Sequence, residues 1–160
     1  MKVGIYGPGR SGKDECAEWL ALNTRLRYWG SSSQVILPHA ALHFGISEKE
    51  AWRLRHQHRE VWRQIGDELR ANDPAHLARV TLKQGDINVG VRAKVEIEAV
   101  RRERLVDIAV WVHRPNIEPD PTLEFGPEQC DIILPNDRTL PHLHARLRNL
   151  ANSWAVLKAS

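Results

Sequence analysis

The chain has 160 residues, of which 42% are hydrophobic and 27% are charged, and its formal net charge at pH 7 is +3. This size and balance are typical of one soluble globular domain, and no stretch approaches the roughly 18 uninterrupted apolar residues of a membrane span. The charge suits an anionic ligand but is lower than that of a dedicated nucleic-acid binder. Cys16 and Cys130 lie far apart without a metal-binding spacing, so we expect reduced thiols in a cytoplasmic protein.

Apolar periodicity, turn residues and capping residues predict strands that alternate with helices. Ser47 with Glu50 forms a capping box at the start of one long helix, and Asp73 is the expected N-cap of the next, with Pro74 at its first position. In chain order, the expected elements are a strand at 2–6, a helix at 12–23, a strand at 26–29, helices at 34–44, 47–71 and 74–84, a strand at 87–91, a helix at 94–104, strands at 107–113 and 131–134, and a helix at 139–157.

A phosphate-binding motif follows the first expected strand. Residues 7–13 read Gly-Pro-Gly-Arg-Ser-Gly-Lys, the G-x-x-x-x-G-K of a P-loop, in the strand–loop–helix context that the motif requires. Backbone N–H groups and the helix N-terminus are expected to cradle the phosphates of ATP, while the lysine reaches the β- and γ-phosphates. Asp14 stands where a Ser or Thr usually serves Mg²⁺, so we expect this carboxylate to hold the metal. The residues expected to contact the nucleotide are Gly7, Gly9, Arg10, Ser11, Gly12, Lys13 and Asp14.

The alternation of strands and helices around this motif predicts an α/β fold of the P-loop NTPase type, and the resemblance given in the next paragraph implies its nucleotide-kinase-like form. We expect three layers, with a mostly parallel five-stranded sheet and helices on both of its faces. Residues 1–160 are expected to form a single domain, with a helical insertion on the acceptor side over about residues 34–84. The long loop at 114–129, which carries Asp120, Thr122 and Glu124, is expected to close over the adenine or the acceptor.

The Gly-Lys-Asp sequence at 12–14 and the residues that follow Arg59 resemble the phage deoxynucleoside monophosphate kinases, P-loop enzymes whose loop commonly reads R-S-G-K-D. Three positions depart from that family's pattern: Glu15 replaces a threonine, Arg63 replaces a glutamine, and Gly90 stands where an Asp usually helps to hold Mg²⁺. The similarity continues through Arg59, Gly66, Arg70, Asp73, Val91, Arg92, Glu96, residues 113–115 and residues 130–136.

The resemblance implies that Arg59, Arg70 and Arg92 bind phosphates of the donor or the acceptor, because a guanidinium can grip a phosphate bidentately. Lys13, Asp14, Arg59 and Arg92 would then be the catalytic set. An arginine-rich helix is equally typical of a solvated face. The metal would rest on Asp14, nucleotide phosphates and water, with Glu96 as an outer carboxylate. Expected surface arginines are Arg53, Arg55 and Arg63.

Three functions remain open. The favoured one is a Mg-ATP-dependent deoxynucleoside monophosphate kinase, encoded by a phage and acting in the host cytoplasm without a membrane. The resemblance also extends to phage kinases that phosphorylate 5-hydroxymethyluracil in DNA, where Asp14 would act as a base. Trp29 would then stack on a flipped-out base, and the alternative is that Trp29 belongs to the core. The third is a nucleotide-binding module without catalysis, which Gly90 supports. The residues expected to bind the acceptor are Ser31, Ser32, Ser33, Arg59 and Arg70.

Overall fold

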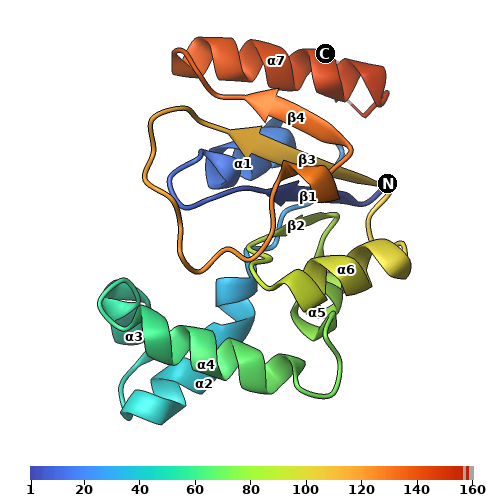
Figure 1. The fold of residues 1–160 in the computed structure, drawn as a ribbon. Coiled ribbons are helices and arrows are strands. Elements are labelled where there is room, and N and C mark those ends of the chain that lie inside the picture. Colours follow the sequence, from blue (N-terminus) through green and yellow to red (C-terminus); the bar gives the residue numbers. More distant parts are fainter. Residues whose placement is uncertain (157, 159–160) are drawn as a thin grey trace.

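The computed structural model describes residues 1–156 and 158, in which strands and helices alternate (Figure 1). None of the helices in this part of the chain is both long and apolar enough to cross a membrane. The elements are β1 (Val3–Tyr6), α1 (Lys13–Asn23), α2 (Ser32–Phe44), α3 (Glu48–Leu54), α4 (Arg59–Arg70), α5 (His76–Gln84), β2 (Ile87–Val89), α6 (Lys94–Arg102), β3 (Ile108–His113), the short 3-10 helix η1 (Pro127–Gln129), β4 (Ile132–Pro135) and α7 (Leu140–Ser153).

The described residues form one parallel sheet of four strands in the order β2-β1-β3-β4 (Figure 1). Val3 of the central strand β1 pairs with Ile87 of β2 on one side and with Ile108 of β3 on the other. β1 is fully buried, and β3 is buried over most of its length, which is the pattern of strands covered on both faces. Because the strands are parallel, their carboxyl ends meet at one edge, where ligands of α/β proteins bind.

The prediction of a fifth strand at residues 26–29 is wrong. This segment touches β2 through Arg27, whose carbonyl oxygen accepts hydrogen bonds from Asp86 N at 2.7 Å and Ile87 N at 3.2 Å. Gly30 then turns the chain, with φ of 152°, and α2 begins two residues later. The extended segment is therefore too short to add a strand beside β2.

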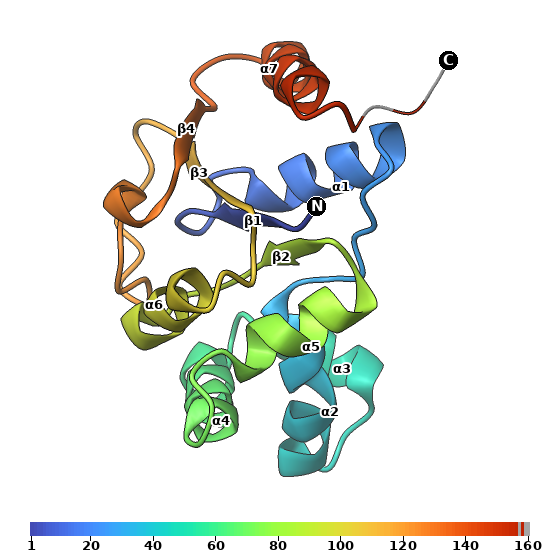
Figure 2. The same ribbon diagram turned by 90° about the vertical axis from the view of Figure 1, so that its right-hand side faces the viewer.

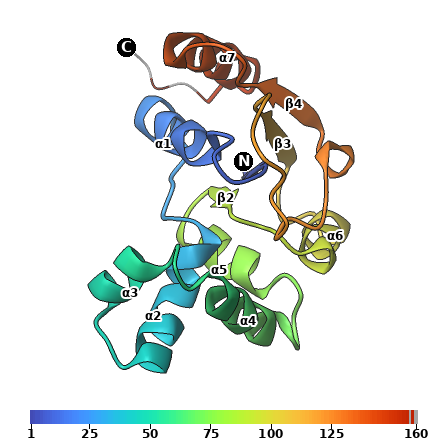
Figure 3. The same cartoon turned by 60° about the vertical axis from the view of Figure 1, so that its left-hand side comes forward.

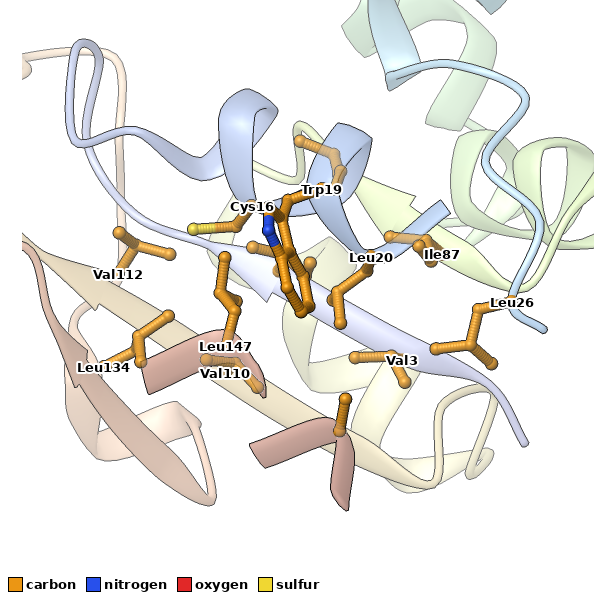
Figure 4. Packing of buried hydrophobic residues seen from close by; sticks show 14 of the residues in the cluster. Val3, Cys16, Trp19, Leu20, Leu26, Ile87, Val110, Val112, Leu134 and Leu147 are labelled. Carbon is orange, nitrogen blue, oxygen red and sulfur yellow. The ribbon is translucent and has the colours of Figure 1, made fainter. Parts of the chain in front are cut away.

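Helices cover both faces of the sheet, as predicted. Figure 2 shows α1 and α7 on one face and α6 on the other. A hydrophobic core lies between the sheet and the helices α1 and α7 (Figure 4). Helix α1 contributes Cys16, Trp19 and Leu20 to it, and α7 contributes Leu147. Each such aliphatic side chain stabilises the fold by about 1.5–3 kcal/mol on burial. The structure thus has the predicted three-layer arrangement around a smaller sheet.

The opposite face also anchors the long loop between β3 and β4. Phe125 of this loop is buried, with its ring centroid 6.0 Å from Tyr6 of β1 and 5.9 Å from Trp111 of β3. Ile97 and Val100 of α6 belong to the same hydrophobic cluster. This packing holds the preceding part of the loop near the end of β1.

Helices α2, α3 and α4 form a separate hydrophobic cluster beyond β2 (Figure 3). Ala40 of α2, Ala51 of α3 and Trp62 of α4 are buried in it, and Leu77 of α5 joins it. The helices of residues 32–84 occupy the region where a helical insertion was expected, and its role as an insertion on the acceptor side stays a prediction.

The single helix predicted over residues 47–71 is wrong, because the structure divides it into α3 and α4. The capping box at its start is confirmed in part, since Ser47 Oγ accepts from Glu50 N at 3.2 Å. After Leu54 the hydrogen bonds shift to tighter turns, and His58 leaves the helical conformation with φ of −115° and ψ of 33°. This break brings the residues between the two helices to the edge of a cavity.

Candidate functional site

The P-loop joins β1 to α1 at the carboxyl edge of the sheet. Gly7 has φ of 148°, and a Cβ atom there would lie 2.7 Å from Val112 O, so only glycine fits. Arg10 and Gly12 have φ of 65° and 96° on either side of Ser11. Such left-handed residues turn successive N–H groups toward one side and create a concave anion site. The loop therefore has the shape that the motif predicts, and the contact of each residue with nucleotide stays a prediction.

Side chains from the ends of β3 and β4 hold the carbonyl groups of the loop. Asn136 Nδ2 donates to Ser11 O at 2.8 Å, and Arg114 Nη1 donates to Arg10 O at 3.2 Å. These two hydrogen bonds fix the carbonyl groups of Arg10 and Ser11 and so hold the second half of the loop in place. Ser11 is fully buried, and its Oγ has no hydrogen-bond partner among the described residues. A buried hydroxyl without a hydrogen-bond partner fits a loop that closes around a phosphate.

Lys13 and Asp14 open helix α1. Lys13 is 7% exposed, and its Nζ donates to Pro8 O at 3.3 Å. Burial lowers the pKa of Lys13, while the nearby carboxylates of Asp14 and Asp120 oppose that change. The side chain of Asp14 is 62% exposed, with its Oδ2 3.9 Å from Lys13 Nζ. Lys13 is therefore a desolvated cation at the mouth of the loop, and Asp14 is a carboxylate that solvent and metal can reach.

ATP and Mg²⁺ fit this part of the site, with one protein carboxylate for the metal. Within residues 1–156 and 158, no three His, Cys, Asp or Glu side chains gather into a metal site. Mg²⁺ commonly uses one or two carboxylates together with nucleotide phosphates and water, so Asp14 suffices as the protein ligand. Glu15 is engaged elsewhere, since its Oε1 lies 2.7 Å from His144 Nε2. Glu96 does not fit the expected role of outer ligand because it is fully buried.

A carboxylate from the β3–β4 loop reaches the P-loop. Asp120 Oδ2 accepts from Gly9 N at 2.9 Å and from Arg92 Nη1 at 2.6 Å. Arg92 Nη1 also donates to Thr122 Oγ1 at 2.7 Å, and the Arg92 carbonyl oxygen accepts from Glu124 N at 2.9 Å. The loop therefore contacts the P-loop and Arg92 through Asp120, which the sequence did not predict, and its closure over the adenine or the acceptor stays a prediction.

An arginine-rich cavity of about 160 Å³ lies between α2, α4, the segment that leads from β2 into α6, and the β3–β4 loop. It is lined by the three arginines predicted to bind phosphate and also by Arg55 and Arg63. Arg53 and Arg63 are exposed, as expected, whereas Arg55 is half-buried. The lining has five arginines and two acidic residues, Asp67 and Glu124. Carboxylates pair with Arg63, Arg70 and Arg92, so the positive charge of the cavity rests mainly on Arg55 and Arg59. The remaining lining residues are Ser32, Ser33, Ile36, His56, Trp62, Gly66, Gly90, Ala93 and Thr122.

His56 reports the positive potential at this cavity. Its pKa is lowered, first by partial burial and then by the charges of Arg55, Arg59 and Arg10. The break between α3 and α4 places these groups together, with Arg59 Nη2 3.5 Å from His56 Nδ1. Because Arg10 belongs to the P-loop, its influence on His56 indicates that the cavity and the P-loop share one electrostatic environment.

Arg70 is held in the cavity wall by two carboxylates. Its Nη2 donates to Asp67 Oδ1 at 2.7 Å and its Nη1 to Glu96 Oε2 at 3.3 Å, and its side chain is 11% exposed. Glu96 Oε1 has no partner among the described residues. Burial raises the pKa of Glu96 to about 7, although the Arg70 charge opposes that rise. Arg70 is thus a fixed cation, supported by a carboxyl group that titrates near neutrality.

The variant Glu96→Gln is expected to remove a pH-dependent loss of stability. The unfolded carboxyl group titrates near 4.5 and the folded one near 7. Below pH 4.5 the Glu96 carboxyl group is protonated in both the folded and the unfolded protein. The stabilisation by neutral Glu96 is therefore complete below that pH and is lost as pH rises toward 7. The wild-type free energy of unfolding should therefore fall by ~3 kcal/mol relative to the variant across this window. Urea titrations from pH 4.5 to 7.5 measure the difference, and a pH-independent difference would contradict the raised pKa.

The predicted acceptor serines lie where α2 meets β2. Ser32 is buried and its Oγ donates to Val89 O at 3.2 Å, so this hydroxyl ties the helix to the strand. Ser32 and Ser33 line the cavity, whereas Ser31 is the N-cap of α2 and stands outside the described lining. Gly90 has φ of 96°, and a Cβ there would lie 3.2 Å from Ser32 N. An Asp at Gly90 would thus be strained, which explains why no carboxylate stands at this position.

Comparison with known proteins identifies a fold and no family. No protein-family model matches the sequence, and no curated protein matches it either. Among solved structures, the shikimate kinase of Bacteroides thetaiotaomicron is similar, with a TM-score of 0.53 and 11% identity over 98% of this chain and 99% of that chain. Such a low identity establishes the architecture alone. The parallel sheet, its flanking helices and the loop after β1 are those of a P-loop kinase fold.

Proposed function

We propose that this chain is a Mg-ATP-dependent phosphotransferase that acts on a deoxynucleoside monophosphate. The observation that carries the proposal is the position of the arginine-rich cavity beside the P-loop. Arg92 lines this cavity and binds the same Asp120 oxygen as Gly9 of the P-loop. An acceptor phosphate held by guanidinium groups in the cavity would therefore lie next to a donor phosphate held by the loop.

The residues of the site have distinct roles in this reaction. An oxygen of the acceptor phosphate forms a bond to the γ-phosphorus as the bond to the β–γ bridging oxygen breaks, which yields ADP and a nucleoside diphosphate. Lys13 offsets negative charge on the transferred group, and Arg59 and Arg92 orient the two anions. Asp14 holds Mg²⁺, which supplies charge neutralisation when bound. A monophosphate is already anionic near pH 7 and needs no base, so one carboxylate at the helix start is enough.

Phosphorylation of the hydroxymethyl group of 5-hydroxymethyluracil in DNA is the second candidate. Trp29 favours this second candidate. Its side chain was expected either to stack on a base or to lie in the core, and Trp29 is 46% exposed. It lies two residues before Ser31, at the end of the segment that leads into α2. In this reaction the acceptor is an alcohol, and Asp14 would take its proton as the new bond to phosphorus forms.

A nucleotide-binding module without catalysis is the third candidate, and the conformation of Gly90 weakens its main support. The missing acidic residue at that position was the argument for lost activity. A positive φ and close packing against Ser32 require glycine there whether or not the protein is active. The absence of an Asp therefore does not indicate that catalysis has been lost.

Transfer of label from γ-labelled ATP tests the three candidates together. The purified protein is incubated with Mg²⁺, labelled ATP and one acceptor at a time: each deoxynucleoside monophosphate, each deoxynucleoside, DNA that contains 5-hydroxymethyluracil, and matched DNA that contains thymine. We expect label on a monophosphate and none on the corresponding nucleoside, because the cavity binds the phosphate. Label retained in the modified polymer alone would replace this proposal by the second candidate, and ATP binding without any transfer would replace it by the third.

A further inference from the structure

Asp120 is the buried anion of the site, and it does not belong to the predicted catalytic set. Its side chain is 5% exposed, and both carboxylate oxygens are engaged. Oδ2 binds Gly9 N and Arg92, while Oδ1 accepts from Thr122 N at 3.1 Å and from Thr122 Oγ1 at 2.7 Å. Although burial disfavours the charge, the hydrogen bonds from Thr122 and Arg92 keep the pKa of Asp120 well below its ordinary value. The carboxylate is therefore ionised at any physiological pH.

The partners of this carboxylate are groups that a phosphate would use. Gly9 N belongs to the loop whose N–H groups form the anion site, and Arg92 is one of the predicted phosphate clamps. Lys13 is close enough for the Asp120 charge to act on its pKa, and Lys13 Nζ contacts Pro8 O next to Gly9. Because the N–H groups of a P-loop bind the donor phosphates, Asp120 Oδ2 at 2.9 Å from Gly9 N occupies a position that a phosphate oxygen would use.

The chain around Asp120 holds it there without help from the anion site. Thr122 fixes Oδ1, and Phe125 three residues later is buried against Tyr6 and Trp111. The contacts on Oδ2 can therefore be exchanged while the rest of the β3–β4 loop remains anchored at Phe125.

We propose that Asp120 is an internal competitor for the donor site: its carboxylate and the phosphates of a nucleoside triphosphate cannot both hold Gly9 N–H and Arg92, so donor binding displaces Asp120 and frees Arg92. This inference rests on the proposed function. Asp120 is then a positioning residue, because it acts through Arg92 and the loop. One oxygen holds both groups, so entry of the donor and release of Arg92 from Asp120 occur together, while Thr122 Oγ1 still accepts from Arg92 Nη1.

Competition predicts that loss of the carboxylate tightens donor binding. The variants Asp120→Asn and Asp120→Ala are compared with wild type by calorimetric titration with ATP, once with Mg²⁺ and once with EDTA. We expect the dissociation constant to fall about tenfold to a hundredfold in both variants, because a charge-assisted hydrogen bond no longer has to be broken. The fall is expected with and without Mg²⁺, since carboxylate and phosphates compete directly.

Asp73→Asn is the matched control. Asp73 also binds one backbone amide, Ala75 N at 3.1 Å, and one guanidinium, Arg79 Nε at 3.0 Å, but it lies between α4 and α5. Its variant should bind ATP as wild type does. Thermal unfolding confirms that every variant is folded.

Each other result of the titrations decides against the inference. Unchanged or weaker ATP binding in both Asp120 variants would overturn the proposed competition. It would indicate instead that Asp120 holds Arg92 in position. Weaker ATP binding that appears only with Mg²⁺ would indicate that Asp120 is a metal ligand, and it would also overturn the proposed competition. If wild type and all variants fail to bind ATP, the proposed function falls and the inference with it, which separates that failure from a failure of competition alone.

Discussion

Replacing Lys13 by methionine is expected to lower the turnover number about a hundredfold to a thousandfold. This is the usual effect of removing one group that stabilises a developing charge. The Lys13 ammonium lies at the mouth of the P-loop and is 7% exposed, so it acts where water does not screen it. Methionine keeps the length of the apolar stem and removes the charge. The turnover number for the acceptor identified by labelling, measured at saturating ATP, checks the prediction.

The fold should survive this substitution. Burial lowers the pKa of Lys13, which means that its charge is unfavourable in the folded protein, and an uncharged side chain of similar size relieves that cost. The control is Lys83→Met on α5. Lys83 is exposed, and its replacement removes the same charge at a position far from the P-loop in the sequence. If Lys13→Met retained near-normal turnover while Lys83→Met behaved as wild type, Lys13 would have no part in phosphoryl transfer.

Local sequence was sufficient to predict the conformation of the P-loop and of the strand and helix that flank it. Gly7 and Gly12 adopt the positive φ values that make glycine necessary, and the flanking strand and helix begin and end close to where apolar periodicity places them. These features depend on the backbone of consecutive residues, so a short motif records them. The parallel sheet with helices on both faces follows from the alternation of strands and helices, whereas the order β2-β1-β3-β4 was not predicted.

The errors occurred where distant contacts overrule local pattern. Residues 26–29 have the composition of a strand, but Gly30 and the start of α2 leave only Arg27 in a position to bond with β2. Residues 47–71 keep a helical period through the break at His58, because the exposed turn needs no Gly or Pro to form. Periodicity reports which side chains are apolar, and it does not report where a helix stops hydrogen bonding.

The arginine-rich cavity was predicted only in part, because distant contacts form it. The resemblance supplied Arg59, Arg70 and Arg92, which the structure brings to one cavity. It gave no sign of the bond between Asp120 and Gly9, whose residues are 111 positions apart. The long loop was expected near the site from its length and composition, but which of its carboxylates faces the P-loop depends on the burial of Phe125.

Replacing Arg70 by methionine is expected to raise the KM for the phosphorylated acceptor about tenfold to a hundredfold, with a smaller change in the turnover number. Arg70 lines the cavity, and Asp67 and Glu96 fix its guanidinium, so its loss removes an oriented phosphate contact. Initial rates over a range of acceptor concentrations measure the effect. Arg53→Met, which removes an exposed arginine paired with Glu50 on α3, should leave the KM unchanged.

The same substitution should destabilise the protein in a pH-dependent way. Without Arg70, a charged Glu96 is buried with no cation beside it, and removing one partner of a buried pair costs about 3–5 kcal/mol. Near pH 5 the raised pKa keeps Glu96 protonated, so the loss of stability should be smaller there than at pH 8. The double variant with Glu96→Gln should recover stability at pH 8 while the KM for the acceptor stays high, because glutamine restores neutrality but not the guanidinium. Recovery of the KM together with stability would mean that Arg70 supports the fold of the cavity and does not bind the acceptor.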